Sequence, residues 1–273
     1  MQSTRIPIQK VAAATISAAQ DDLAIEEPLE LHLLHGSAGR KNTQVVSVTM
    51  RTPGADAALG AGFLFTEGIL RRGDEIAAIS EAAFGLNTIL ITLKDDVVPR
   101  LQKAERNFYT TSSCGVCGKA GIDAIKTVSP YPQQPDNMMV DAALLYALPA
   151  ALCSRQDTFN STGGLHASAL FDLEGNFIAL QEDVGRHNAL DKLIGAAFLK
   201  DALPLHRHLL LLSGRASFEL VQKAAMAGIK MIAAVGAPSS LAVELAAESG
   251  ITLLGFLRGE RFNIYTGAQR IKA

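Results

Sequence analysis

Residues 209–261, which decide the fold of the chain, read LLLLSGRASFELVQKAAMAGIKMIAAVGAPSSLAVELAAESGITLLGFLRGER. Short apolar runs predict three buried strands, at 209–212, 231–235 and 252–257. Longer stretches between them predict two helices, at 218–227 and 241–248. Strands that alternate with helices indicate a parallel sheet covered by helices. We therefore predict the α/β class, with a three-layer α/β/α C-terminal half.

The loops after these strands are predicted to meet at one edge of the sheet, because the carboxyl ends of parallel strands converge on one crevice. The loops are 213–217, 236–240 and 258–261. They offer small residues, hydroxyl groups, helix N-termini and three arginines, which together suit a phosphate or pyrophosphate group. The chain contains neither a Walker A sequence nor G-x-G-x-x-G, so an ordinary nucleotide-binding fingerprint is absent.

The residues just before this unit predict a helix and a hairpin. Asp141 can cap a helix that runs to about Gln156 and bends at Pro149. Apolar runs at 167–171 and 177–180 flank a turn rich in polar residues, which is typical of two antiparallel strands.

The N-terminal half has the pattern of a mixed α/β domain. Strand-length apolar runs occur at 29–34, 45–50 and 87–93, and helical stretches at 57–70 and 121–128. The N-terminus is predicted to be a frayed start followed by a first strand, because its middle is rich in Ala, Thr and Ser, unlike a signal peptide.

A polar segment with three prolines, residues 129–137, separates the two halves. Such a segment cannot continue a helix or a central strand. We therefore place a domain boundary there and predict two domains, 1–136 and 137–273.

The composition excludes several classes of protein. Of the 273 residues, 48% are hydrophobic and 19% are charged, which is typical of a folded globular chain. The formal net charge of -2 gives no general signal for nucleic acid or for an anionic membrane, although it allows a local basic pocket. No apolar run approaches the roughly 18 residues of a membrane span. The three cysteines do not form a disulfide framework. A cytoplasmic protein is predicted.

Cys114 and Cys117 form a C-x-x-C pair, which has three common meanings: half of a zinc site, a dithiol redox couple, or a nucleophilic thiol with a neighbour. A zinc site needs further ligands, and the remaining cysteine, Cys153, is expected to be a small buried residue of an apolar helix. A thioredoxin-like couple usually has Trp or Pro beside it, and the chain has no Trp. Lys119 and the amides of a following helix would lower a thiol pKa. We therefore favour a thiolate that receives and hands on a sulfur atom, and predict no metal site.

The histidines raise two further possibilities. His166 resembles the histidine of nucleobase deaminases, but Ser168 stands where their glutamate would be. Residues 182–188 are the densest polar cluster, just before a predicted amphipathic helix that starts at Asn188. In this cluster, Arg186 is a candidate for ligand binding and His187 for proton transfer or hydrogen bonding. The alternative is a structural role for the cluster in helix capping.

Several long motifs occur in a fixed order along the chain. They are EEPL at 26–29, GFLFTEGI at 62–69, CGVCG at 114–118, TGGLHA at 162–167, EDVGRHNALDK at 182–192 and SGR at 213–215. Together they resemble the formate dehydrogenase accessory sulfurtransferase family (FdhD/NarQ), from about Glu26 to Tyr265.

The resemblance implies an activity and partners. A cysteine desulfurase would pass persulfide sulfur to the loop cysteines, and the protein would transfer it to the molybdenum bis(molybdopterin guanine dinucleotide) cofactor of formate dehydrogenase. It also implies a homodimer and a C-terminal half similar to the cytidine deaminase fold.

Carried onto this sequence, the resemblance makes Cys114 the persulfide carrier and Cys117 its partner. It also implies cofactor binding by the stretch after the last parallel strand, which consists of Phe256, Leu257, Arg258, Gly259, Glu260 and Arg261. With the candidates from the residue patterns, the predicted cofactor site further includes Ser213, Arg215, Arg186 and His187.

Two alternatives remain open. One is a non-enzymatic cofactor chaperone, in which the cysteine loop only guards or docks the cofactor. The other is a zinc-binding relative of the deaminases, against which Ser168 argues.

Overall fold

The structure is a computed structural model that describes residues 2–101, 127–131 and 137–272. Its strands are β1 (Ser3–Ala12), β2 (Thr15–Ala24), β3 (Glu27–Ser37), β4 (Arg40–Arg51), β5 (Ile76–Glu81), β6 (Thr88–Leu93), β7 (Val140–Asp141), β8 (His166–Phe171), β9 (Phe177–Asp183), β10 (Leu209–Leu212), β11 (Met231–Ala234), β12 (Thr252–Arg258), β13 (Arg261–Thr266) and β14 (Ile271–Lys272). Its α-helices are α1 (Asp56–Thr66), α2 (Ala142–Cys153), α3 (Asp157–Thr162), α4 (Arg186–Leu199), α5 (Phe218–Met226) and α6 (Ser240–Glu248). The predicted mixed α/β class is confirmed.

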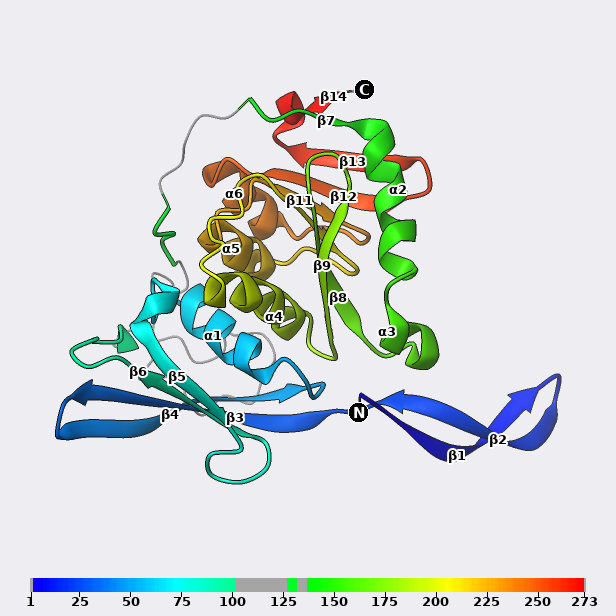
Figure 1. Ribbon diagram of the computed structural model, residues 1–273. Helices are drawn as coiled ribbons and strands as arrows, with labels where there is room; N and C mark the ends of the chain where they lie inside the picture. The colour runs from blue at the N-terminus through cyan, green and yellow to red at the C-terminus, as the bar shows by residue number, and fades with distance from the viewer. Residues whose placement is uncertain (1, 102–126, 132–136, 273) are drawn as a thin grey trace.

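The C-terminal half is built on a sheet with the strand order β13-β12-β11-β10-β8-β9. The predicted parallel strands β10, β11 and β12 form its centre, while β8 and β13 run antiparallel to their neighbours. Leu210 and Leu212 face α4, α5 and α6, whereas Leu209 and Leu211 face α2. Figure 1 shows these helices on opposite sides of the sheet, which gives the three predicted layers. The likeness to cytidine deaminase stays a prediction.

The N-terminal half adds a second sheet, with the strand order β4-β3-β6-β5. One face of this sheet packs on α1, and α1 in turn packs on α4 (Figure 1). The helices approach closely because glycines face each other. A Cβ on Gly62 would overlap the carbonyl oxygen of Asp191, and one on Gly195 would overlap that of Ala58.

One hydrophobic cluster extends from the N-terminal sheet to the C-terminal sheet. It contains Leu31 of β3, Phe65 of α1, Ile194 of α4 and Val221 of α5. The domain boundary at 136/137 stays a prediction, and a large apolar interface joins the two predicted domains.

The N-terminus differs from the expectation of a frayed start. β1 begins at Ser3 and forms a regular antiparallel hairpin with β2, with ten residue pairs from Ser3–Ala24 to Ala12–Thr15. The turn residues Ala13 and Ala14 both have positive φ angles, of 46° and 66°. Hairpin turns of this kind usually contain Asn-Gly or Asp-Gly, so the Ala-Ala turn gave no sequence signal.

Helix α2 begins as predicted, with the Asp141 side chain accepting a hydrogen bond from the Ala143 amide at 2.9 Å. It ends at Cys153, earlier than the expected Gln156, and Pro149 lies inside it. The prediction of a buried Cys153 is wrong: the residue is exposed, because it is the last of the helix and lies off the buried face of Leu145 and Leu148. Of the helix predicted at 121–128, only Thr127 and Val128 are described, and neither is helical.

Candidate functional site

The predicted site residues outside the cysteine motif gather at one edge of the C-terminal sheet. Because β8 runs antiparallel to β10, its first residue, His166, lies at the edge where β10, β11 and β12 end. Asp183, the last residue of β9, pairs with His166. The chain therefore brings the 182–188 cluster to the same edge as the 213–217 loop.

Backbone hydrogen bonds hold the loops of this edge together. The Gly236 amide donates to the Gly214 carbonyl at 3.0 Å, and the Phe256 amide donates to the Gly236 carbonyl at 3.1 Å. The Ser213 hydroxyl accepts a hydrogen bond from the Ala167 amide at 2.8 Å, which ties its loop to β8. Arg215, in the first of these loops, lies against Gly236 of the second loop and is exposed.

The third predicted segment, 256–261, is the tip of the β12–β13 hairpin. Arg258 pairs with Arg261 across the turn, and both are exposed, as are Gly259 and Glu260. Phe256 has a positive φ of 55°, next to a break in the strand register, and its ring lies 5.9 Å from the Arg258 guanidinium carbon. Leu257 is fully buried in the core beside α2, so only its backbone can meet a ligand.

His187 is paired with a residue that the sequence reading missed. Its Nε2 lies 2.7 Å from Oε2 of Glu219, in the first turn of α5, and both side chains are almost buried. Although the two side chains lie within ion-pair distance, His187 Nε2 has no hydrogen-bond partner among the described residues, and the same holds for three further buried polar atoms here: Arg186 Nε, Ser217 Oγ and Glu219 Oε1. Buried polar groups normally have partners, so this concentration marks the helix starts as a place for a bound group or water. The sequence feature that could have pointed to Glu219 as a site residue is its position two residues after Ser217, at the start of a predicted helix.

His166 lies among the same charges. Partial burial lowers the pKa of His166, and Arg186 and His187 lower it further, while Asp183 acts in the opposite direction. The imidazole is therefore held in its neutral form at neutral pH.

The rest of the 182–192 motif has a structural role. The Lys192 ammonium lies 2.7 Å from Asp183 Oδ2 and donates to the Thr52 carbonyl at 2.7 Å, and Lys192 and Asp183 are buried. The Asn188 amide donates to Asp183 and to the Met50 carbonyl. This buried network links α4 to the end of β4. The sequence had suggested only that the cluster caps a helix, so the link between the two halves is an additional structural role.

A second buried network lies on the other side of α4. Lys223 of α5 contacts Asp191 at 2.9 Å, Thr66 at 2.9 Å and Glu67 at 3.3 Å. Burial lowers the pKa of Lys223, but Asp191 and Glu67 outweigh it, so the net shift is upward. The GFLFTEG and EDVGRHNALDK motifs therefore meet here.

Cys114 and Cys117 lie outside the described residues, but the segments that flank them are placed. The Arg100 amide donates to the Ile69 carbonyl, and the Leu101 side chain is buried. On the other side, the Thr127 amide donates to the Gln222 side chain of α5 at 3.2 Å. Gln222 is four residues, or about 6 Å, from the first residue of α5. Thr127, the first described residue after the cysteines, therefore contacts α5 about one helical turn from the helix start and the 213–217 loop.

No group of three or more His, Cys, Asp or Glu side chains that could hold a metal ion occurs in ranges 2–101, 127–131 and 137–272. In the same part of the chain, no helix has both the length and the apolar character needed to cross a membrane.

Comparison with known proteins identifies the family of this chain. The sequence profile of the FdhD/NarQ family matches residues 24–272. The chain belongs to the FdhD/NarQ family. It is 49% identical to a Streptomyces avermitilis protein named sulfur carrier protein FdhD, over 98% of this chain and 95% of that protein. A Mycolicibacterium paratuberculosis protein of the same name is 48% identical, over 98% of each chain.

A more distant FdhD/NarQ relative and a solved structure extend the comparison. A sulfur carrier protein FdhD from Sulfurisphaera tokodaii is 38% identical, over 99% of this chain and all of that protein. A crystal structure from Desulfotalea psychrophila matches with a TM-score of 0.75 over the whole of both chains, at 24% identity. This likeness supports the fold.

Proposed function

We propose that this protein is a sulfurtransferase that carries persulfide sulfur from a cysteine desulfurase to the molybdenum bis(molybdopterin guanine dinucleotide) cofactor, in the cytoplasm, for formate dehydrogenase. The names of its relatives support sulfur carriage. The observation that carries the proposal is the hydrogen bond from Thr127, the first described residue after the cysteines, to Gln222 of α5, about one helical turn from an edge with arginines and unpartnered buried polar atoms.

Cys114 would receive the sulfur. Its thiolate attacks the outer sulfur of the donor's persulfide, a new S–S bond forms on Cys114, the donor's S–S bond breaks, and the donor leaves as a thiolate. When the cofactor is bound, attack by the Cys117 thiolate on the Cys114 sulfur forms a Cys114–Cys117 disulfide and releases the outer sulfur as hydrosulfide for the metal; without the cofactor the persulfide stays on Cys114. A cellular dithiol must reduce this disulfide before the next cycle.

The cofactor is the cargo of this reaction, and the edge suits its nucleotide ends. Arg215, Arg258 and Arg261 are exposed and can pair with pyrophosphate oxygens, and the N-termini of α5 and α6 favour negative charge. Arg186 and His187 would approach from the start of α4. Delivery within one chain is within reach, because the ten Cα–Cα steps from Cys117 to Thr127 span at most about 36 Å.

Formate dehydrogenase maturation in cells that lack their own copy of this protein tests the proposal. We expect Cys114→Ala to abolish formate dehydrogenase activity while the purified variant still binds guanosine diphosphate. Arg258→Ala is expected to weaken that binding by about tenfold or more, because a hydrogen bond to a charged group contributes about 1.5–3 kcal/mol. Titration calorimetry measures the binding.

Arg207→Ala is the matched control, since Arg207 is exposed and precedes β10, at the opposite edge of the sheet. It should leave both readouts unchanged. If Cys114→Ala supports full maturation and Arg258→Ala does not, the protein is a cofactor chaperone and not a sulfurtransferase.

A further inference from the structure

The residues on either side of the cysteine segment, which is defined here as residues 102–126, contact the same turn of the fold. Before the segment, the Arg100 amide donates a hydrogen bond to the Ile69 carbonyl at 3.1 Å. After it comes Thr127, and a Cβ on Gly68 would lie 3.9 Å from the Cγ2 atom of Thr127. Two consecutive residues of the turn that follows α1 therefore contact the described chain on both sides of the segment.

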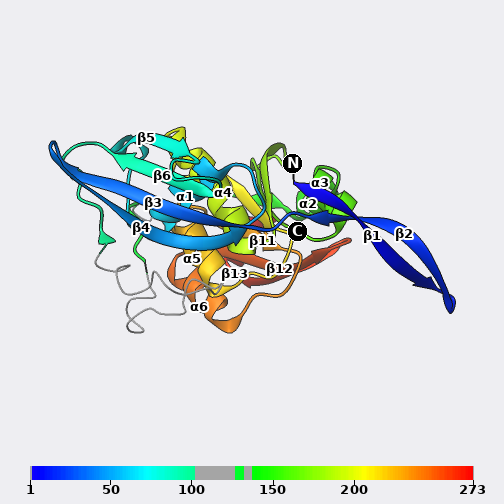
Figure 2. The same ribbon diagram turned by 90° about the horizontal axis from the view of Figure 1, so that it is seen from below.

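Helix α5 is the second support of the residues that follow the cysteines. The Gln222 side chain accepts the hydrogen bond of the Thr127 amide at 3.2 Å. One helical turn further along α5, the Met226 carbonyl accepts a hydrogen bond from the Ser129 hydroxyl at 3.3 Å. Figures 1 and 2 show α1, α4 and α5 side by side, so the two supports are neighbours.

Lys223, the residue after Gln222, joins these two supports. Its buried ammonium donates to the Thr66 hydroxyl at 2.9 Å and lies 3.3 Å from a carboxylate oxygen of Glu67. Both of these residues lie at the end of α1, directly before the turn. On α4, the ammonium contacts the two carboxylate oxygens of Asp191 at 3.1 and 2.9 Å, and the Thr66 hydroxyl donates to Asp191 at 2.7 Å. One cation thus connects α5 with the end of α1 and with α4.

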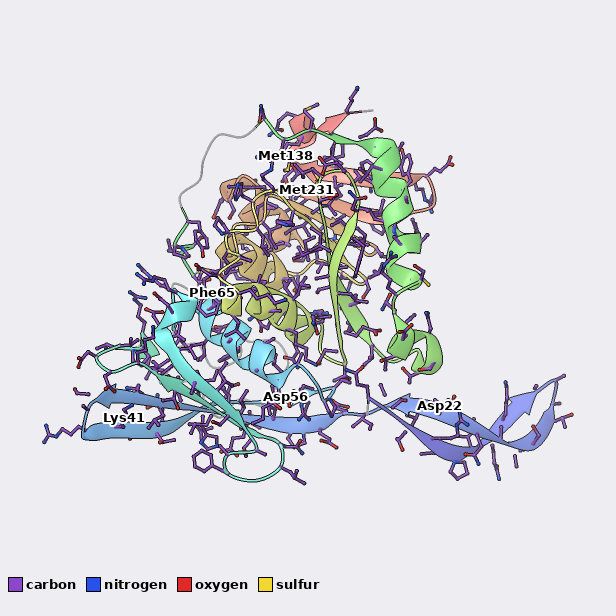
Figure 3. All side chains as sticks on the ribbon, in the orientation of Figure 1. Asp22, Lys41, Asp56, Phe65, Met138 and Met231 are labelled. Carbon is purple, nitrogen blue, oxygen red and sulfur yellow. The ribbon has the colours of Figure 1, made fainter. Side chains whose placement is uncertain are left out.

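The charges of this junction make the ammonium necessary. In Figure 3, Phe65 marks the end of α1 at which the junction lies, and Asp56 marks the far end. The carboxylates of Asp191 and Glu67 outweigh the effect of burial and raise the pKa of Lys223, so its side chain is charged at neutral pH. Without this cation, the two carboxylates would repel each other at a buried contact and drive α1 away from α5.

We propose that Lys223 is a positioning residue for sulfur transfer, which holds the attachment points Arg100 and Thr127 at a fixed separation and so sets where Cys114 meets the donor. The inference rests on the proposed function. A misplacement of about 1 Å, caused far from the reacting atoms, can slow a reaction by about 100-fold. The proposal also gives a role to the motif at 62–69, which contributes no residue to the predicted cofactor site.

Lys223→Met in the full-length protein tests the proposal, with Lys192→Met as the matched control. Each variant removes a buried cation that faces a buried aspartate, but the partners of Lys192 are Asp183 and the Thr52 carbonyl, at the junction of α4 and β4. The readout is the rate at which a cysteine desulfurase and cysteine add sulfur, followed by intact mass at a temperature at which both variants are folded. The maximal rate should fall by about tenfold or more in Lys223→Met, at an unchanged half-saturating concentration of desulfurase. Lys192→Met should keep nearly the native rate.

Hydrogen–deuterium exchange gives a second readout, which does not require sulfur transfer. The amides of Arg100 and Thr127 should exchange several-fold faster in Lys223→Met than in the native protein and in Lys192→Met, because their supports separate. Unchanged exchange at these amides, or equal slowing of sulfur addition by the two lysine variants, would overturn the proposal. A native protein that takes up no sulfur would instead overturn the proposed function, and the exchange rates would still show whether Lys223 joins the two supports.

A pair of variants at Thr66 keeps the test decisive if Lys223→Met does not fold. Thr66→Val keeps the shape of the side chain but removes the hydroxyl that contacts both Lys223 and Asp191, whereas Thr66→Ser retains this hydroxyl. Sulfur addition should slow by about threefold or more in Thr66→Val and stay near the native rate in Thr66→Ser. Equal rates in the two Thr66 variants would contradict the positioning role.

Discussion

Lys192→Met is expected to lower the free energy of unfolding by about 3–5 kcal/mol, because it leaves the buried Asp183 carboxylate without its counter-charge. Methionine fills nearly the same space, so the loss reflects charge and hydrogen bonding rather than a cavity. The Thr52 carbonyl also loses its ammonium donor, which weakens the join between α4 and β4. Urea denaturation followed by circular dichroism measures the change.

Lys41→Met is the matched control for this substitution. Lys41 also forms an ion pair, with Asp95 at 3.0 Å, but both side chains are well exposed. Removal of such a pair should cost less than about 1 kcal/mol. If the two variants lose equal stability, the buried network does not hold the halves together.

Gly195→Ala should destabilise the protein by about 3 kcal/mol or more, because the added methyl group would overlap the Ala58 carbonyl on α1. A backbone atom cannot rotate away as a side chain can, so the two helices must separate. Separation disrupts the apolar cluster that both sheets share. Thermal unfolding at neutral pH measures the effect.

Gly60→Ala, in the same helix as Gly62, separates this overlap from a general effect of replacing glycine. A Cβ at position 60 would meet only the terminal methyl groups of Ile91 at 3.0 Å and Leu31 at 3.1 Å, which can shift. Alanine also favours the helix over glycine. Equal losses at positions 60 and 195 would contradict the close helix crossing.

The C-terminal sheet was predictable because its strands are fully buried and read as uninterrupted apolar runs, such as Leu209–Leu212. The gathering of the strand-end loops follows from the parallel topology alone. The position of His166 at the same edge was harder to predict from the sequence. It depends on the antiparallel pairing of β8 with β10, which joins residues that are distant in the chain.

Other features of the structure leave no local pattern in the sequence from which they could be predicted. The Glu219–His187 pair joins residues 32 positions apart, and a lone acidic residue at a helix start looks like an ordinary first-turn residue. The buried ion pairs of Lys192 and Lys223 were missed because lysine is normally exposed. The β1–β2 hairpin was missed because its turn, Ala13 and Ala14, lacks glycine and asparagine.

The central claim is that Cys114 carries the sulfur. The most direct test is to incubate the protein with a cysteine desulfurase and cysteine, and to measure its intact mass. The account predicts one added sulfur atom on the native protein and on Cys117→Ala, and none on Cys114→Ala. Because Cys153 is exposed, Cys153→Ala serves as the control and should keep the adduct. A native protein without added sulfur, or an adduct that persists in Cys114→Ala, would contradict the account.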